Sequence, residues 1–180
     1  MRFAIAAVLA AFVLAPLGQS QKLDLKFDAL AAKASEKAEV DLDASILKLA
    51  LPHVLAAKGK DKDTKQLDDI LSGLQELHVR HYAFAKADAY SDKDLEPLRK
   101  EVGEAAGWSR IVNVKDGKDN VEVFAQSQAG KISGCLIVAA AAKELSIVHI
   151  MGTMTTAQLK EMVDSKVAFN LAALMDMPGK

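Results

Sequence analysis

The sequence predicts an α+β fold in which helices cover an antiparallel sheet. Four strand-like segments follow one another in the C-terminal half, short turns join them, and helix-like segments precede and follow the run. Strands joined by short turns pair antiparallel, whereas strands that alternate with helices form parallel sheets. We therefore expect an antiparallel sheet built largely from this C-terminal four-strand meander, with the helices packed mainly on one face.

The N-terminus has the layout of a secretory signal peptide. A positive charge at Arg2 precedes an unbroken apolar run over residues 3–15, and small residues precede a cut after Ser20. This run is shorter than the roughly 20 residues of a membrane-spanning helix. We expect cleavage after Ser20 and export, with an uncleaved anchor as the alternative. Residues 21–180 are then a single domain without a further transmembrane span.

Hydrophobic periodicity predicts the first elements of this domain. Residues 21–38 carry apolar side chains at roughly helical spacing, and residues 39–43 are consistent with a short strand. Residues 45–57 are apolar and helix-like. Pro52 predicts a kink or a helix start within them, because proline lacks the backbone N–H. Residues 58–63 are a charged loop that separates this helix from the next.

Two helices flank a further strand in the middle of the chain. Thr64 is a good N-cap, and the apolar residues after it follow the i, i+3, i+4, i+7 pattern of a helix. Residues 77–85 have strand propensity through valine and aromatic side chains. Ser91 begins the next helix, Pro97 leaves its start open by about one turn, and Gly107 closes it.

The meander consists of four strands and a following helix. The strands are residues 108–114, 121–126, 132–140 and 145–154, joined by turns at residues 115–120, 128–131 and 143–144. Alternation in the first strand predicts one face made of Trp108, Arg110, Val112 and Val114. The third strand is almost continuously apolar, which is typical of a central strand. Thr155 or Thr156 caps the last helix.

Composition argues against several classes of function. Lysine plus arginine number 23 against 24 aspartate plus glutamate, so the chain lacks the basic excess of a nucleic-acid binder. Aromatic residues make up 5%, too few for a stacking surface for single strands or sugars. The single cysteine excludes an intramolecular disulfide and a zinc site built from several cysteines. We expect no nucleic-acid partner.

Histidines are the first candidates for chemistry. His78 and His81 are three residues apart, so on a strand they lie on opposite faces and do not bind one metal without a bulge. His53 and His149 lie in apolar segments and are expected to be ordinary core or edge residues. The motif His-Glu-x-x-His is absent. We expect no metal site and no cofactor.

Four other residues have both a chemical and a structural interpretation. Cys135 lies in an apolar strand and is expected to pack in the core; a disulfide-linked dimer requires it to be exposed. Asp41 and Asp43 share one strand face, where like charges raise one pKa or where Asp43 simply caps the next helix. Trp108, the only tryptophan, either packs as an anchor in the core or contacts a partner. No nucleophile elbow, phosphate loop or calcium loop is present, so we expect no enzyme.

Three stretches resemble the bacterial family called domain of unknown function 4252. They are residues 78–102, 107–126 and 131–154, within a resemblance that spans roughly Leu25 to Lys180. The patterns that carry it are Tyr90-Ser91-x-x-Asp94-Leu95, Gly107-Trp108-Ser109, Gly134, Lys143-Glu144-Leu145 and Gly152. His149 departs from it, because an asparagine is expected there. The resemblance implies a small exported or lipid-anchored protein of a family without an assigned activity.

Genes of some family members lie beside those of sigma and anti-sigma factors, which implies envelope signalling. Together with the signal peptide, this predicts a non-catalytic exported module that binds a protein partner in the cell envelope. An edge strand of the meander is the expected surface for it. Two alternatives remain: a carrier or sensor of an apolar ligand in a cavity under the sheet, and a hydrolase that uses His78, His81 or Asp41. The oligomeric state stays open.

Overall fold

The structure is a computed structural model that describes residues 23, 27–46, 48–49, 73–105, 107–128 and 130–159. The helices are α1 (Asp28–Lys33) and α4 (Asp92–Glu104). The strands are β1 (Glu36–Asp43), β2 (Leu74–Ala83), β3 (Trp108–Asp116), β4 (Asp119–Gln128), β5 (Lys131–Ala140) and β6 (Glu144–Met154). The predicted signal peptide, the loop at residues 58–63 and the helix after Thr64 up to residue 72 lie outside the described residues. Leu74, which the apolar pattern assigned to that helix, is instead the first residue of β2.

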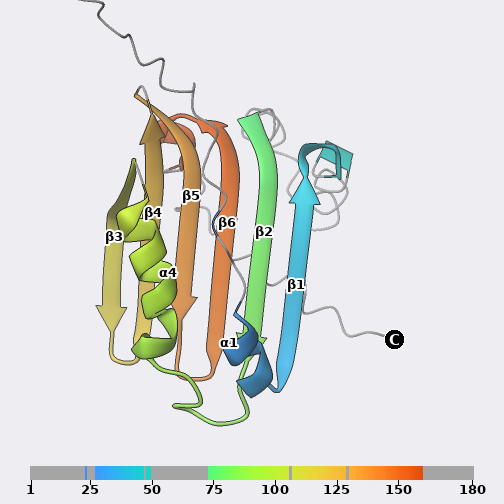
Figure 1. The fold of residues 1–180 in the computed structure, drawn as a ribbon, viewed down its shortest axis with the longest axis vertical. Coiled ribbons are helices and arrows are strands. Elements are labelled where there is room, and N and C mark those ends of the chain that lie inside the picture. The colour runs from blue at the N-terminus through green and yellow to red at the C-terminus, as the bar shows by residue number, and fades with distance from the viewer. Residues whose placement is uncertain are drawn as a thin grey trace, which may run out of the picture.

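All six strands form one antiparallel sheet in the order β1-β2-β6-β5-β4-β3 (Figure 1). The run from β3 to β6 is the predicted meander, with each strand beside the next. Gly117, with a φ of 58°, lies in the tight turn between β3 and β4, where a side chain would be strained. β2 pairs with β6 and carries β1 on its other side, so β1 and β3 are the two edges.

Each face of the sheet carries its own apolar cluster. The first includes side chains of α1 and α4, which lie on the same side of the sheet in Figure 1, and we call this side the helical face. Its buried members are Leu23, Leu30, Tyr82, Phe84, Leu95, Leu98, Val102, Trp108, Phe124, Leu136, Val138, Leu145 and Ile147. On the opposite face lie Leu74, Leu77, Val79, Val123, Ala125, Ile132, Cys135, Ile137, Val148, Ile150, Met154 and Leu159.

These clusters bear on the prediction that helices pack mainly on one face. α1 and α4 agree with it, because their buried leucines belong to the cluster of the helical face. The predicted helix over residues 45–57, the helix after Thr64 and the last helix all extend outside the described residues. For the chain as a whole, the packing of helices on one face therefore stays a prediction.

The first predicted helix is too long. α1 ends at Lys33 because Ala34 has extended backbone, and residues 36–38 already pair with β2. The apolar spacing that favoured a helix over residues 21–38 therefore covers a helix and the start of a strand. By contrast, α4 begins after Ser91 as predicted, with a capping box between Ser91 and Asp94. It ends at Glu104, three residues before Gly107.

A β-bulge overturns the predicted face of β3. The register with β4 shifts between Arg110 and Val112, so that Ile111 is the extra residue. Trp108 and Arg110 stay on the helical face, but Val112 lies opposite Val123 and packs with the other cluster. A one-residue shift inverts every later side chain of a strand. The prediction that Trp108, Arg110, Val112 and Val114 share one face is therefore wrong.

Candidate functional site

A row of aromatic and acidic side chains crosses the helical face. Asp41 on β1 lies opposite His78 on β2, and His78 lies opposite His149 on β6. The rings of His78 and His149 are stacked with centroids 5.8 Å apart, and the indole of Trp108 lies 5.9 Å from His149. We call Asp41, His78, His149 and Trp108 the histidine row. The sequence singled out each of these residues separately, and the sheet brings them together.

Trp108 reaches His149 because Gly134 leaves room on β5. A Cβ at Gly134 would lie 3.2 Å from two atoms of the indole, so the ring rests against bare backbone. Trp108 is only 8% exposed, and its buried Nε1 has no hydrogen-bond partner among the described residues. The ring thus packs as a core anchor, and its role as a partner contact stays a prediction.

His78 is held between two carboxylates. Its Nδ1 lies 2.5 Å from Asp41 Oδ1, and its Nε2 lies 3.0 Å from Glu76 Oε2. Both ring nitrogens of His78 therefore lie within hydrogen-bond distance of a carboxylate oxygen. With both nitrogens engaged, His78 in this arrangement has no nitrogen left to act as a general base.

Asp41 is stabilised as a carboxylate. Arg80 Nη2 lies 2.9 Å from Asp41 Oδ1, beside the contact from His78. Partial burial raises the pKa of Asp41, but the hydrogen bonds from His78 and Arg80 outweigh it and hold this pKa below its ordinary value. Glu76 and Arg80 were missed by the sequence analysis. Alternation was the available signal, because positions 76, 78 and 80 of one strand share a face.

Of the two roles considered for Asp43, the structure shows the helix cap. Its Oδ1 accepts hydrogen bonds from the backbone N–H groups of Ser45 and Ile46 at 2.8 and 3.0 Å, and from the Ser45 hydroxyl at 2.6 Å. These bonds cap the helical residues 44–46 and hold the pKa of Asp43 below its ordinary value. The alternative that Asp41 and Asp43 raise one another's pKa is wrong.

The opposite face holds the other two candidates. His81 Nδ1 lies 2.9 Å from the Ser146 hydroxyl, which confirms that His78 and His81 lie on opposite faces. Cys135 is fully buried, and burial raises the pKa of its thiol to about 12. This confirms core packing and removes the exposure that a disulfide-linked dimer requires. Within the described ranges, no group of three His, Cys, Asp or Glu side chains is arranged to hold a metal ion.

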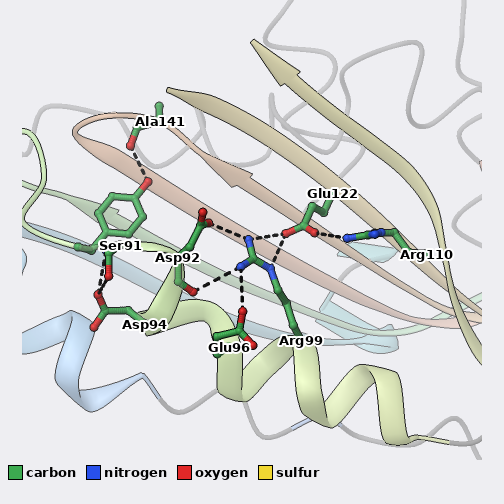
Figure 2. A network of polar contacts seen from close by, with 9 residues as sticks. Ser91, Asp92, Asp94, Glu96, Arg99, Arg110, Glu122 and Ala141 are labelled. Carbon is green, nitrogen blue, oxygen red and sulfur yellow. Dashed lines mark hydrogen bonds and ion pairs between the residues drawn. The ribbon is translucent and has the colours of Figure 1, made fainter. Parts of the chain in front are cut away.

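A buried carboxylate joins α4 to the sheet (Figure 2). Glu122 on β4 is almost fully buried and lies 2.8 Å from Arg99 of α4 and 3.0 Å from Arg110 of β3. Arg99 also contacts Asp92 at 3.0 Å, near the start of its own helix. The sequence analysis did not single out Glu122, since a glutamate in an alternating strand is normally solvent-facing. Its position under α4 makes it structural.

Within the described part of the chain, the sheet has an edge strand at each side and a hollow lies between the two helices. Among the described strands, β3 pairs only with β4, and its Ile111 and Val114 are 51% and 57% exposed. β1 pairs there only with β2 and has no buried residue. Between α1 and α4 a hollow of about 150 Å³ is lined by Phe27, Asp28, Ala29, Leu30, Asp94, Pro97, Leu98 and Glu101.

The comparisons with known proteins concern this same part of the chain. Residues 33–162 match the model of a family described as a domain of unknown function, DUF4252. No curated protein and no solved structure matches the chain. Of the helices that the described residues form, none has the length and apolar character to cross a membrane.

Proposed function

The chain belongs to the DUF4252 family, and from this premise we propose that it is a non-catalytic, exported module that binds a protein partner in the bacterial cell envelope. The observation that carries the proposal is the open edge at β3. Natural sheets usually protect an edge by covering or shortening it. Here nine residues form an edge strand with two apolar side chains more than half exposed.

An extended partner segment fits this edge by strand addition. The partner gains main-chain hydrogen bonds from the edge strand, and its side chains alternate between the two faces. Ile111 and Val114 would provide apolar contacts on binding, and Trp108 at the start of β3 anchors the strand from within the core. The engaged nitrogens of His78 and the buried thiol of Cys135 favour binding over catalysis. Export rests on the signal-like residues 1–20.

The proposal is tested by a pull-down from solubilised envelope with residues 21–180 as bait. We expect one stoichiometric protein partner, identified by mass spectrometry. Ile111→Asp combined with Val114→Asp should remove it, because charged groups on the edge oppose apolar contact. The matched control is Ile46→Asp with Leu49→Asp, which places the same charges on exposed apolar residues away from β3. Equal capture by the two double variants would refute binding at this edge.

The second candidate is a carrier of an apolar small ligand. The hollow between α1 and α4 has apolar walls from Phe27, Leu30 and Leu98, but its roughly 150 Å³ is below the range of about 300–1,000 Å³ typical of ligand pockets. The open edge therefore favours the binding module. Solvent extraction of the same bait distinguishes the two, since a carrier releases a reproducible lipid and captures no protein.

A further inference from the structure

The two edges that the described strands leave unpaired, β1 and β3, are complementary to each other. The sheet contains six strands in strictly antiparallel order, so β1 and β3 run in opposite directions. A second copy placed beside the first, with its helical face on the same side, brings its β1 antiparallel to β3. Antiparallel neighbours are what the rest of this sheet already contains.

The side chains of the two edges match on both faces. On the helical face, β3 presents Arg110, Asn113 and Lys115, whereas β1 presents Lys37, Glu39, Asp41 and Asp43. On the opposite face, β3 presents Val112 and Val114, whereas β1 presents Ala38, Val40 and Leu42. One edge is therefore basic and the other mainly acidic on the helical face, and both are apolar on the other face.

One register satisfies both faces. With Val114 opposite Val40 of a second copy, Val112 comes opposite Leu42, since antiparallel partners change in opposite directions along the chain. The same register places Lys115 opposite Glu39 and Asn113 opposite Asp41. The bulge at Ile111 then returns Arg110 to the helical face beside Asp43. Apolar pairs and opposite charges directly across two strands are the contacts that stabilise a sheet.

We propose that the partner of the β3 edge is the β1 edge of a second copy of this chain, so that copies join head to tail into a continuous sheet. This inference rests on the proposed function and names its partner. Pairing of like edges is disfavoured, because β1 with β1 brings carboxylates together and β3 with β3 brings Arg110 and Lys115 together. A head-to-tail contact leaves one β1 and one β3 free at the ends, which permits open-ended assembly.

A charge swap tests the pairing on the full chain as the producing cell processes it. Sedimentation velocity over a concentration series should show masses above the monomer. Lys115→Glu alone and Glu39→Lys alone should each weaken association about fivefold, because a favourable cross-strand pair becomes a repulsive one. Mixing the two variants should restore association, since Lys115 of one faces Glu39 of the other. Lys93→Glu on the exposed surface of α4 makes the same charge change away from both edges and should leave association intact.

The outcomes separate this inference from the proposed function. Loss in both single variants with recovery in the mixture supports head-to-tail pairing. A wild-type chain that stays monomeric at every concentration overturns it, as does association that survives both single variants or does not recover on mixing. In those cases capture of an envelope protein that depends on Ile111 and Val114 would still support the proposed function. Self-association without any other captured protein would identify the second copy as the partner.

Discussion

At the residue scale, the absence of a Cβ atom at Gly134 determines how the residues of the histidine row come into contact. Trp108 starts on the edge strand, yet its ring reaches His149 on β6, because Gly134 on the intervening β5 has no Cβ. Trp108 and Gly134 both belong to the sequence patterns that carry the family resemblance, but these patterns do not show that the two residues are in contact. That contact depends on Gly134 facing the same side as Trp108, which only the sheet register determines.

Two glycine-to-alanine substitutions should change stability in opposite directions. Gly134→Ala places a methyl group 3.2 Å from the indole and should lower the free energy of unfolding by about 1–3 kcal/mol. Gly103→Ala lies in α4 and meets no atom of the described residues within 4 Å apart from its chain neighbours and the nearby helix backbone, so alanine should raise stability by roughly 0.5–1 kcal/mol. Urea unfolding measures both. Trp108 fluorescence, the only tryptophan signal, should shift in Gly134→Ala alone. Equal stability of the two variants would contradict the packing described for Gly134.

At the element scale, Glu122 fixes α4 to the outer strands of the meander. It connects Arg99 and Arg110, which come from a helix and a strand on either side of it (Figure 2). Because burial of a carboxylate is costly without partners, these two contacts offset the cost of burying Glu122. The element therefore depends on a polar contact as well as on Leu95, Leu98 and Val102.

Removing this carboxylate should destabilise the fold. Glu122→Gln removes the charge and leaves one acceptor oxygen, so that an NH₂ group faces one of the two arginines. It should lower the free energy of unfolding by about 1–3 kcal/mol, since both arginines retain some contact with water. The matched control is Glu104→Gln, which breaks an exposed pair with Lys100 and should have little effect. Chemical unfolding followed by circular dichroism gives both values. Equal effects would show that Glu122 does not hold α4.

The elements also show where sequence reasoning succeeds and where it stops. The part of β1 at residues 39–43, the start of α4 and the opposite faces of His78 and His81 follow from local alternation and capping, so the sequence predicts them. The bulge at Ile111 does not, because nothing in the alternation of residues 108–114 marks an extra residue. Bulges are set by the partner strand, and a prediction from one strand alone misses them.

At the scale of the whole molecule, the strand order is the step that local patterns leave undetermined. The meander from β3 to β6 follows from short turns, but β2 joins it beside β6 across sixty intervening residues. That long-range pairing brings Asp41 and His78 to His149 and leaves β1 and β3 as edges. Both the histidine row and the complementary edges are thus products of topology, although every residue in them is visible in the sequence.

The depressed pKa values of carboxylates on two such long-range contacts predict how the whole fold responds to acid. Asp41 pairs with His78 and Arg80 across β1 and β2, and Asp94 pairs with Lys33 across α4 and α1 at 2.7 Å. Burial raises the pKa of Asp41, but the hydrogen bonds from His78 and Arg80 lower it by more. The hydrogen bond from Lys33 lowers the pKa of Asp94. Both end below the ordinary 3.8. A folded pKa below the unfolded one stabilises the fold above the unfolded value, and this stability is lost as pH falls through the folded pKa.

We therefore expect the free energy of unfolding to fall as the pH drops below about 4, the ordinary range of an aspartate. Asp41→Asn and Asp94→Asn should each flatten this acid limb, since the substituted side chain no longer takes up a proton on unfolding. Asp88→Asn is the control, because its contact with Lys118 is between two exposed side chains. Urea titrations from pH 6 to pH 3 measure the slope. An acid limb of unchanged slope in both variants would show that these ion pairs do not couple protonation to folding.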